Sequence, residues 1–132
     1  MFNSLLKIED LELSFKMYEG ISTVLKKINM ELNKGEKVAL VGESGSGKSV
    51  TTKLILGLLN QKNVYKAGKI IFNQRDILNL SEKDFKKIRG NNISIIFQDP
   101  TAALNPVFKI KNQFHEVNLN YNNKISRKDS YI

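Results

Sequence analysis

Residues 42–49 read Gly42-Glu43-Ser44-Gly45-Ser46-Gly47-Lys48-Ser49, which is a G-x-x-x-x-G-K-S pattern. A loop that encloses phosphate groups with backbone N–H donors needs glycines where a side chain would block the approach. The lysine reaches the β- and γ-phosphate oxygens in such loops, and the hydroxyl of the next serine takes one coordination position on Mg²⁺. The stretch, with the following Val50, therefore predicts a site for a nucleoside triphosphate and its Mg²⁺.

This pattern is convincing only between a buried strand and a helix. Residues 37–41 read Lys-Val-Ala-Leu-Val, and this apolar, β-branched run predicts a strand buried on both faces. After the loop, apolar residues recur at helical spacing, which predicts a helix packed on a sheet, weakened but not ended by Gly57: Val50, Leu54, Ile55, Leu58 and Leu59. The alternative is a glycine-rich turn without a ligand.

The composition bounds the class of protein. A chain of 132 residues suits one modest domain, and the absence of cysteine excludes disulfides and thiolate metal sites. The only histidine, His115, cannot form a metal site alone, and no apolar run approaches the roughly 18 residues of a membrane span, so we expect a soluble chain without a covalent metal or haem cofactor. The net charge of +8 comes almost entirely from scattered lysines, which favours a solvated surface over a nucleic-acid partner.

The residues before the loop predict a hairpin. Leu11, Leu13 and Phe15 alternate with polar residues, as in a strand with one buried face. A turn at residues 17–20 follows, and a mostly alternating pattern then resumes from Val24 to Leu32.

The residues after the first helix predict four further elements. Gly68 to Phe72 has the composition of a short strand, and Ser81 to Asp84 is a capping box for a helix that runs to about Arg89 and is closed by Gly90. Residues 93–97 predict a second buried strand, which ends before Pro100. A helical pattern follows, made by Ile110, Phe114, Val117 and Tyr121. A last capping box at residues 126–129 stands three residues before the end, which suggests a truncated chain.

Several classes of phosphate-loop protein fit less well. The loop lacks the third glycine of the dinucleotide-binding pattern. Residues 123–126 partly match the N-K-x-D guanine reader, but Ser126 stands where a carboxylate is needed. A small kinase needs arginines on a lid over the transferred phosphoryl group, and three scattered arginines support this poorly.

The sequence resembles the ATP-binding subunits of ABC transporters along nearly its whole length. Besides the loop, residues 25–36 are similar to that family's approach to it, and residues 96–100 to its Q-loop. Residues 42–50, Arg89-Gly90, and residues 97–100 followed by Leu104-Asn105-Pro106 are most similar to the oligopeptide, dipeptide and nickel importer branch.

The resemblance implies an α/β fold with a partial P-loop NTPase core of the RecA-like type. By this resemblance, residues 1–36 form an antiparallel β portion, residues 37–99 the core, and residues 100–132 the start of a helical subdomain of one incomplete nucleotide-binding domain. It also implies roles for single residues. Gln98 would contact Mg²⁺ and the attacking water and couple nucleotide state to the membrane subunits, unless it is only a polar cap on a strand end. Phe15, or alternatively Tyr18, would stack on adenine, although Phe15 also suits core packing.

Parts that the family uses are missing from these residues, namely the L-S-G-G-Q signature, the Walker B strand with its catalytic glutamate, and the switch histidine. His115 lies too early for that histidine and suits a helix surface. Residues 93–99 are not a Walker B strand, because Gln98 interrupts them and no glutamate follows. We therefore expect the chain to bind ATP and to hydrolyse it poorly alone.

By the same resemblance, the partners are transporter membrane subunits and a second ATP-binding subunit. The location would be cytoplasmic, peripheral on the inner face of the plasma membrane, and the transported substrate a peptide. Two alternatives remain open at this point: a small self-contained P-loop phosphotransferase, and a non-catalytic truncated remnant with exposed strand edges.

Overall fold

The computed structural model describes residues 4–59, 63–99 and 104–121. The chain divides into two compact units, residues 1–85 and residues 86–132, and each is described by itself. The elements follow one another as three strands and a short fourth, with one helix inside this series and two after it: β1 (Ser4–Met17), β2 (Gly20–Asn33), α1 (Lys48–Ile55), β3 (Val64–Phe72), β4 (Arg75–Asp76), α2 (Glu82–Ile88) and α3 (Ile110–Tyr121).

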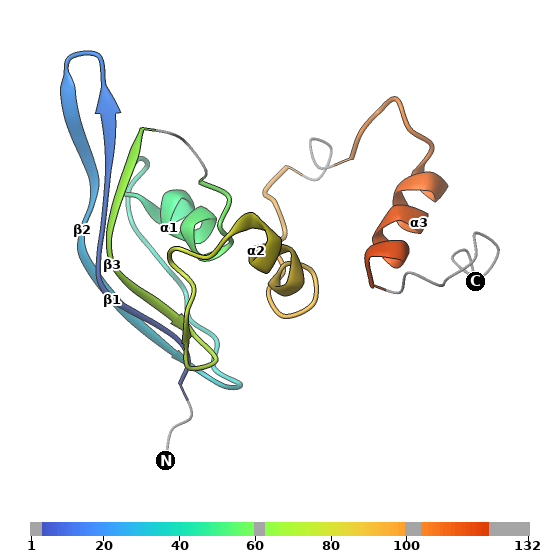
Figure 1. Cartoon of the computed structure of the whole chain (residues 1–132), viewed down its shortest axis with the longest axis horizontal. Helices are drawn as coiled ribbons and strands as arrows, with labels where there is room; N and C mark the ends of the chain where they lie inside the picture. The colour runs from blue at the N-terminus through green and yellow to red at the C-terminus, as the bar shows by residue number, and fades with distance from the viewer. Residues whose placement is uncertain (1–3, 60–62, 100–103, 122–132) are drawn as a thin grey trace. The chain divides into compact units, whose positions relative to one another are not determined.

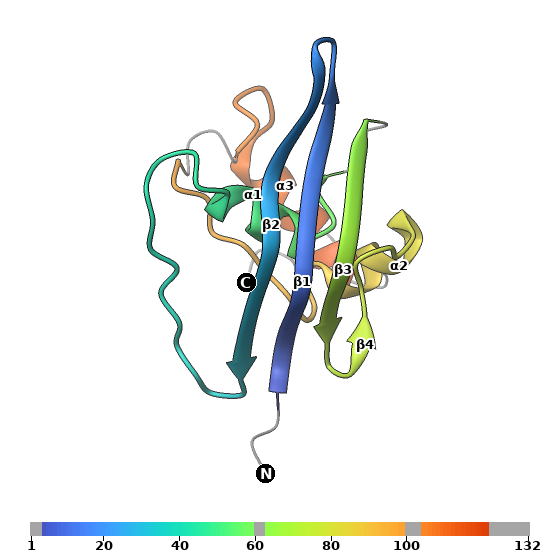
Figure 2. The ribbon, with the colours of Figure 1, turned by 90° about the vertical axis from the view of Figure 1, so that its left-hand side faces the viewer.

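The first unit is built on an antiparallel sheet (Figure 1), and Figure 2 shows its strand order β2-β1-β3-β4. A turn at Tyr18 and Glu19 joins β1 to β2, which confirms the predicted hairpin. The predicted short strand from Gly68 is also confirmed, as the second half of the longer β3, which pairs with the other side of β1. Figure 2 shows the three long strands side by side, with α1 behind them.

The core lies between the sheet and α1. Alternation along β1 places Leu11 and Leu13 on the covered face, where neither side chain has any exposed surface. Leu54 of α1 lies on the same face, as the spacing of the apolar residues predicts. Leu25 of β2 is also buried there, whereas the alternating pattern predicted Val24, which is only half-buried. All buried apolar residues of the described chain lie in this unit: Leu6, Ile8, Leu11, Leu13, Leu25, Leu54, Leu56, Ile70, Phe72, Ile77, Leu78 and Phe85.

An irregularity in the hairpin is held by one asparagine. Asp10 and Lys27 both have left-handed backbones, with φ of 44° and 47°. The side chain of Asn29 accepts a hydrogen bond from the Asp10 N–H at 2.9 Å, and donates to the Asp10 carboxylate at 3.2 Å and to the Lys27 carbonyl at 3.0 Å. These bonds satisfy backbone groups that the interrupted ladder leaves unpaired.

Helix α1 ends earlier than the apolar stripe predicts. Gly57 has a φ of 62°, so the helix stops at Ile55, and Leu58 is 40% exposed. A Cβ on Gly57 would come within 2.5 Å of the Phe85 ring. The expectation that the stripe continues through Gly57 is therefore wrong, because glycine there adopts the left-handed conformation that closes a helix and lets an aromatic ring approach.

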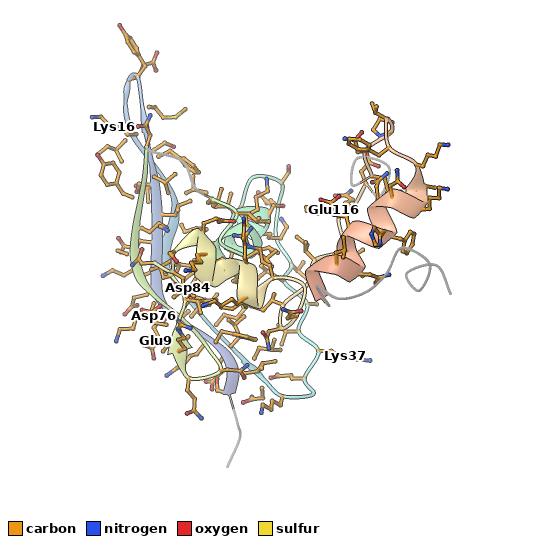
Figure 3. All side chains as sticks on the ribbon, turned by 45° about the vertical axis from the view of Figure 1, so that its right-hand side comes forward. Glu9, Lys16, Lys37, Asp76, Asp84 and Glu116 are labelled. Atoms are coloured by element: carbon orange, nitrogen blue, oxygen red, sulfur yellow. The ribbon has the colours of Figure 1, made fainter. Side chains whose placement is uncertain are left out.

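The two predicted buried strands at residues 37–41 and 93–97 are not strands. Residues 36–43 run as an extended connection, on which Figure 3 shows the Lys37 side chain pointing away from the ribbon. Val38 and Leu40 are about half exposed and Val41 is 89% exposed, and Ile96 is 97% exposed. The physical reason is that a strand buried on both faces needs neighbouring strands, and the described residues supply none beyond a single bridge between Arg89 and Ile93.

The helices beyond the sheet follow their sequence signals. Ser81 and Asp84 form the predicted capping box, with the Ser81 hydroxyl donating to the Asp84 carboxylate at 2.7 Å and accepting from the Asp84 N–H at 3.2 Å. The predicted helical pattern from Ile110 becomes α3, whose first turn is tied by the Gln113 amide to the backbone of Asn105 and Phe108. Among residues 86–99 and 104–119, no side chain is buried. The capping box at residues 126–129 lies outside the described residues.

With a sheet, three helices and a loop-to-helix turn in the described residues, the fold class is α/β, as predicted.

Candidate functional site

The predicted phosphate loop connects the extended residues 36–43 to α1. A turn closed by a hydrogen bond of 3.2 Å from the Ser46 N–H to the Glu43 carbonyl reverses the chain. Gly45 and Gly47 have left-handed backbones, with φ of 81° and 92°. Both positions therefore favour glycine by their conformation, and of the two only Gly47 is fixed by the G-x-x-x-x-G-K-S pattern.

The loop ends at the N-terminus of α1. Gly47 is the N-cap residue, no side chain caps the helix, and no acidic residue stands in its first turn. The first N–H groups of a helix have no partner inside it, and the helix dipole makes this end positive. The end of α1 is thus electrostatically suited to an anion, and Ser49 presents an exposed hydroxyl in the same turn.

The side chain of Lys48 lies across the loop. Its ammonium donates to the Gly42 carbonyl at 2.7 Å, to the Glu43 carbonyl at 2.5 Å, and to the Ser46 hydroxyl at 3.1 Å. These bonds use all three donors of an ammonium group and hold its charge over the loop. A Cβ on Gly42 would come within 2.8 Å of the Ser46 hydroxyl oxygen, which would have to rotate away from Lys48.

The loop rests on β2 and on the first turns of α1. Gly47 is buried, and a Cβ on it would come within 2.5 Å of Leu25 Cδ2. Below the loop is a cavity of about 250 Å³, lined in part by Leu25, Ile28, Ser46, Lys48 and Thr51. Neither Leu25 nor Thr51 was predicted to support the loop. A signal for Thr51 was present, since it stands three residues before Leu54 and thus on the buried face of the helix.

The other predicted site residues lie as follows. Val50 is half-buried in the first turn of α1, and Glu43 and Ser44 are exposed in the turn. Phe15 is half-buried on β1, opposite Ser22 of β2 and Val64 of β3, whereas Tyr18 is fully exposed at the hairpin turn. Phe15 thus shares the alternation of Leu11 and Leu13, and of the two aromatic residues it is the one on the sheet face that carries the loop.

Gln98 belongs to the second unit and is exposed. Its predicted contact with Mg²⁺ stays a prediction. His115 is half-buried on α3. No helix in the described part of the chain has the length and hydropathy needed to cross a membrane.

Comparison with known proteins agrees with this geometry. Residues 25–130 match the model of the ABC transporter family. The chain is 43% identical over 126 residues to the dipeptide transport ATP-binding protein DppD of Lactococcus lactis, covering 95% of this chain and 36% of that protein. It is 46% identical over 114 residues to the oligopeptide transport ATP-binding protein OppD of Bacillus subtilis, covering 86% of this chain and 32% of that protein. The chain thus spans about a third of the length of these relatives.

Proposed function

The chain belongs to the ABC transporter family, and on that premise we propose that residues 42–50 bind the triphosphate of ATP with Mg²⁺. The observation that carries this proposal is the position of Lys48, whose ammonium is held over a glycine loop at the N-terminus of a helix. Positive charge, backbone N–H groups and the positive end of a helix dipole meet at one place, which is what a polyphosphate requires. A phosphate oxygen would replace at least one of the three loop acceptors of the Lys48 ammonium.

The residues fit the two ligands. A Cβ on Gly42 would meet the Ser46 hydroxyl inside the loop, and a Cβ on Gly47 would meet Leu25 of β2, so glycine at both positions keeps the loop tightly wound on the hairpin. Ser49 would supply one oxygen ligand to Mg²⁺. When bound, Mg²⁺ would neutralise charge between the β- and γ-phosphates, while Lys48 neutralises it from the protein side.

We propose that these 132 residues bind ATP without turning it over efficiently. Hydrolysis needs groups that position the attacking water and stabilise the developing charge. Among these residues there is no L-S-G-G-Q signature and no Walker B strand with its catalytic glutamate to serve in that role. Phosphate release at a rate comparable with that of a complete ATP-binding subunit, and lost in Lys48→Ala, would contradict this part of the proposal.

We further propose that the protein serves peptide import as an ATP-binding subunit, together with membrane subunits and a second ATP-binding subunit on the cytoplasmic face of the membrane. The support is the likeness to relatives whose names specify dipeptide and oligopeptide transport. Co-purification of the protein with its transporter subunits, and loss of peptide uptake when Lys48 is replaced in the cell, would test this.

The binding proposal is tested by titrating the chain with Mg²⁺-ATP, measuring heat or displacement of a fluorescent nucleotide. We expect Lys48→Ala to weaken binding by roughly 10- to 100-fold, because it removes a charge-assisted contact. Lys53→Ala is the matched control, since Lys53 is an exposed lysine in the last turn of the same helix. Equal affinity of the two variants would refute the role given to the loop.

A further inference from the structure

We propose that Thr51 is a positioning residue for nucleotide binding, although it lies outside the G-x-x-x-x-G-K-S pattern. Its hydroxyl fixes the peptide between Gly47 and Lys48, and thereby the direction of the Lys48 N–H toward the bound phosphate. This inference rests on the proposed function and adds a residue to it.

Two donors of Thr51 meet at one acceptor. The Thr51 N–H donates to the Gly47 carbonyl at 2.8 Å, and the Thr51 hydroxyl donates to the same oxygen at 3.0 Å. Both lone pairs of this carbonyl are therefore used. Because the hydroxyl is buried, water does not compete for the bond.

The Gly47 carbonyl is where such a restraint has the greatest effect. Gly47 has a φ of 92° and a ψ of −1°, has no side chain to limit its backbone, and caps α1 without a side-chain hydrogen bond. In a trans peptide the C=O and the next N–H point in opposite directions in one plane. Holding the Gly47 carbonyl along the helix therefore aims the Lys48 N–H out of the helix N-terminus, where an anion binds.

A threonine at this buried position needs an explanation. Thr51 is 5% exposed and is the one buried polar or charged residue among residues 4–59, 63–99 and 104–119. It borders the same cavity as Leu25 and Ile28, where an aliphatic side chain would pack without any hydroxyl to satisfy. Back-bonding by threonine inside a helix does not itself stabilise the helix. The Thr51 hydroxyl thus positions the backbone of the loop and does not add to the packing of the core.

The neighbouring Thr52 provides a matched comparison. Its hydroxyl makes the same type of bond, to the carbonyl of Lys48 at 3.1 Å, but it is exposed. Lys48 is already inside the helix and does not need the additional restraint, and water competes with an exposed bond. We therefore expect Thr52 to contribute little to nucleotide binding.

The experiment compares Thr51→Val, Thr51→Ser and Thr52→Val in the full chain. Measurements are the dissociation constant for Mg²⁺-ATP, the free energy of unfolding in urea, and the resonance position and hydrogen exchange of the Lys48 amide without nucleotide. We expect Thr51→Val to weaken ATP binding about fivefold, the effect of one hydrogen bond, while its unfolding free energy stays equal to or above that of Thr52→Val. Thr51→Ser and Thr52→Val should bind within about twofold of the parent chain.

The outcomes separate the inference from the function on which it rests. The positioning role is overturned if Thr51→Val binds ATP as tightly as the parent chain, or if Thr51→Ser binds it as weakly as Thr51→Val. It is also overturned if the loss of ATP affinity is accompanied by a loss of unfolding free energy. If the parent chain itself fails to bind Mg²⁺-ATP, the proposed function fails. The resonance position and hydrogen exchange of the Lys48 amide then test the positioning role by themselves. A change at residues 47–49 in Thr51→Val alone supports the positioning of this peptide, and identical amides in both valine variants overturn it.

Discussion

Leu25 lies directly against Gly47, so closely that a methyl group on Gly47 would come within 2.5 Å of Leu25 Cδ2. Leu25 is 1% exposed and pairs with Leu13 in the sheet, so it cannot move aside without disturbing the core. The conformation of the predicted phosphate loop therefore depends on its contact with the hairpin as well as on its own glycines.

This contact predicts that Gly47→Ala weakens both folding and nucleotide binding. A side chain at φ of 92° costs about 1–2 kcal/mol, and the clash with Leu25 adds to it. Urea unfolding and ATP titration measure the two effects. Gly35→Ala is the control, because Gly35 has a φ of 77° but nothing within 4 Å of the added Cβ. Equal unfolding free energies in the two variants would show that the contact with Leu25 does not limit the residue at position 47.

The Phe85 ring and Gly57 form a second close contact that predicts a stability effect. Gly57→Ala introduces a methyl group 2.5–2.6 Å from three ring atoms at a φ of 62°. We expect the free energy of unfolding to fall by about 2–4 kcal/mol, because overpacking and left-handed strain combine. Gly90→Ala, at a φ of 81° in open space, should cost only the conformational part. A Gly57→Ala variant as stable as Gly90→Ala would contradict the packing described.

The extended residues 37–41 predict a pattern of hydrogen exchange. Their amides lie in no strand, and Val38, Leu40 and Val41 are exposed, so we expect exchange close to that of an unfolded peptide. Amides of β1 and β3 around Leu11 and Ile70, both fully buried, should be protected by several orders of magnitude more. Mass spectrometry of peptides after deuterium labelling resolves the two regions. Equal protection of both would mean that residues 37–41 do form a strand.

If Phe15 rather than Tyr18 stacks on adenine, replacing Phe15 should weaken the binding of a ligand that has a base and not of one that lacks it. Because Phe15 lies half-buried on the sheet face and Tyr18 is fully exposed at the turn, we expect Phe15→Leu to weaken ATP binding by roughly tenfold. Leucine retains most of the apolar volume while removing the ring. Binding of inorganic triphosphate, which has no base to stack, should be unchanged. Tyr18→Leu is the comparison, and a selective loss of ATP affinity there would assign the stacking role to Tyr18 instead.

Local signals in the sequence were enough for several elements. The hairpin follows from alternation around a turn, α2 from the Ser81 capping box, and α3 from helical spacing. Each of these depends on residues within about one turn or one strand pair, so local chemistry specifies it. The end of α1 was misjudged because a glycine inside an apolar stripe can either stay helical or turn left-handed, and its contact with Phe85 lies 28 positions further along the chain.

Taken alone, the sequence determined the family and predicted the phosphate loop with its glycines, because these depend on residue types at fixed spacing. Tertiary structure alone decided two further features. Residues 37–41 and 93–97 have the composition of buried strands, yet a strand requires neighbours. In the described residues they are largely exposed, and one bridge at Ile93 is their only strand-like pairing. The supports of the loop, Leu25 below Gly47 and the Thr51 hydroxyl on its carbonyl, became visible only when the hairpin and α1 were brought together by the packing of the core.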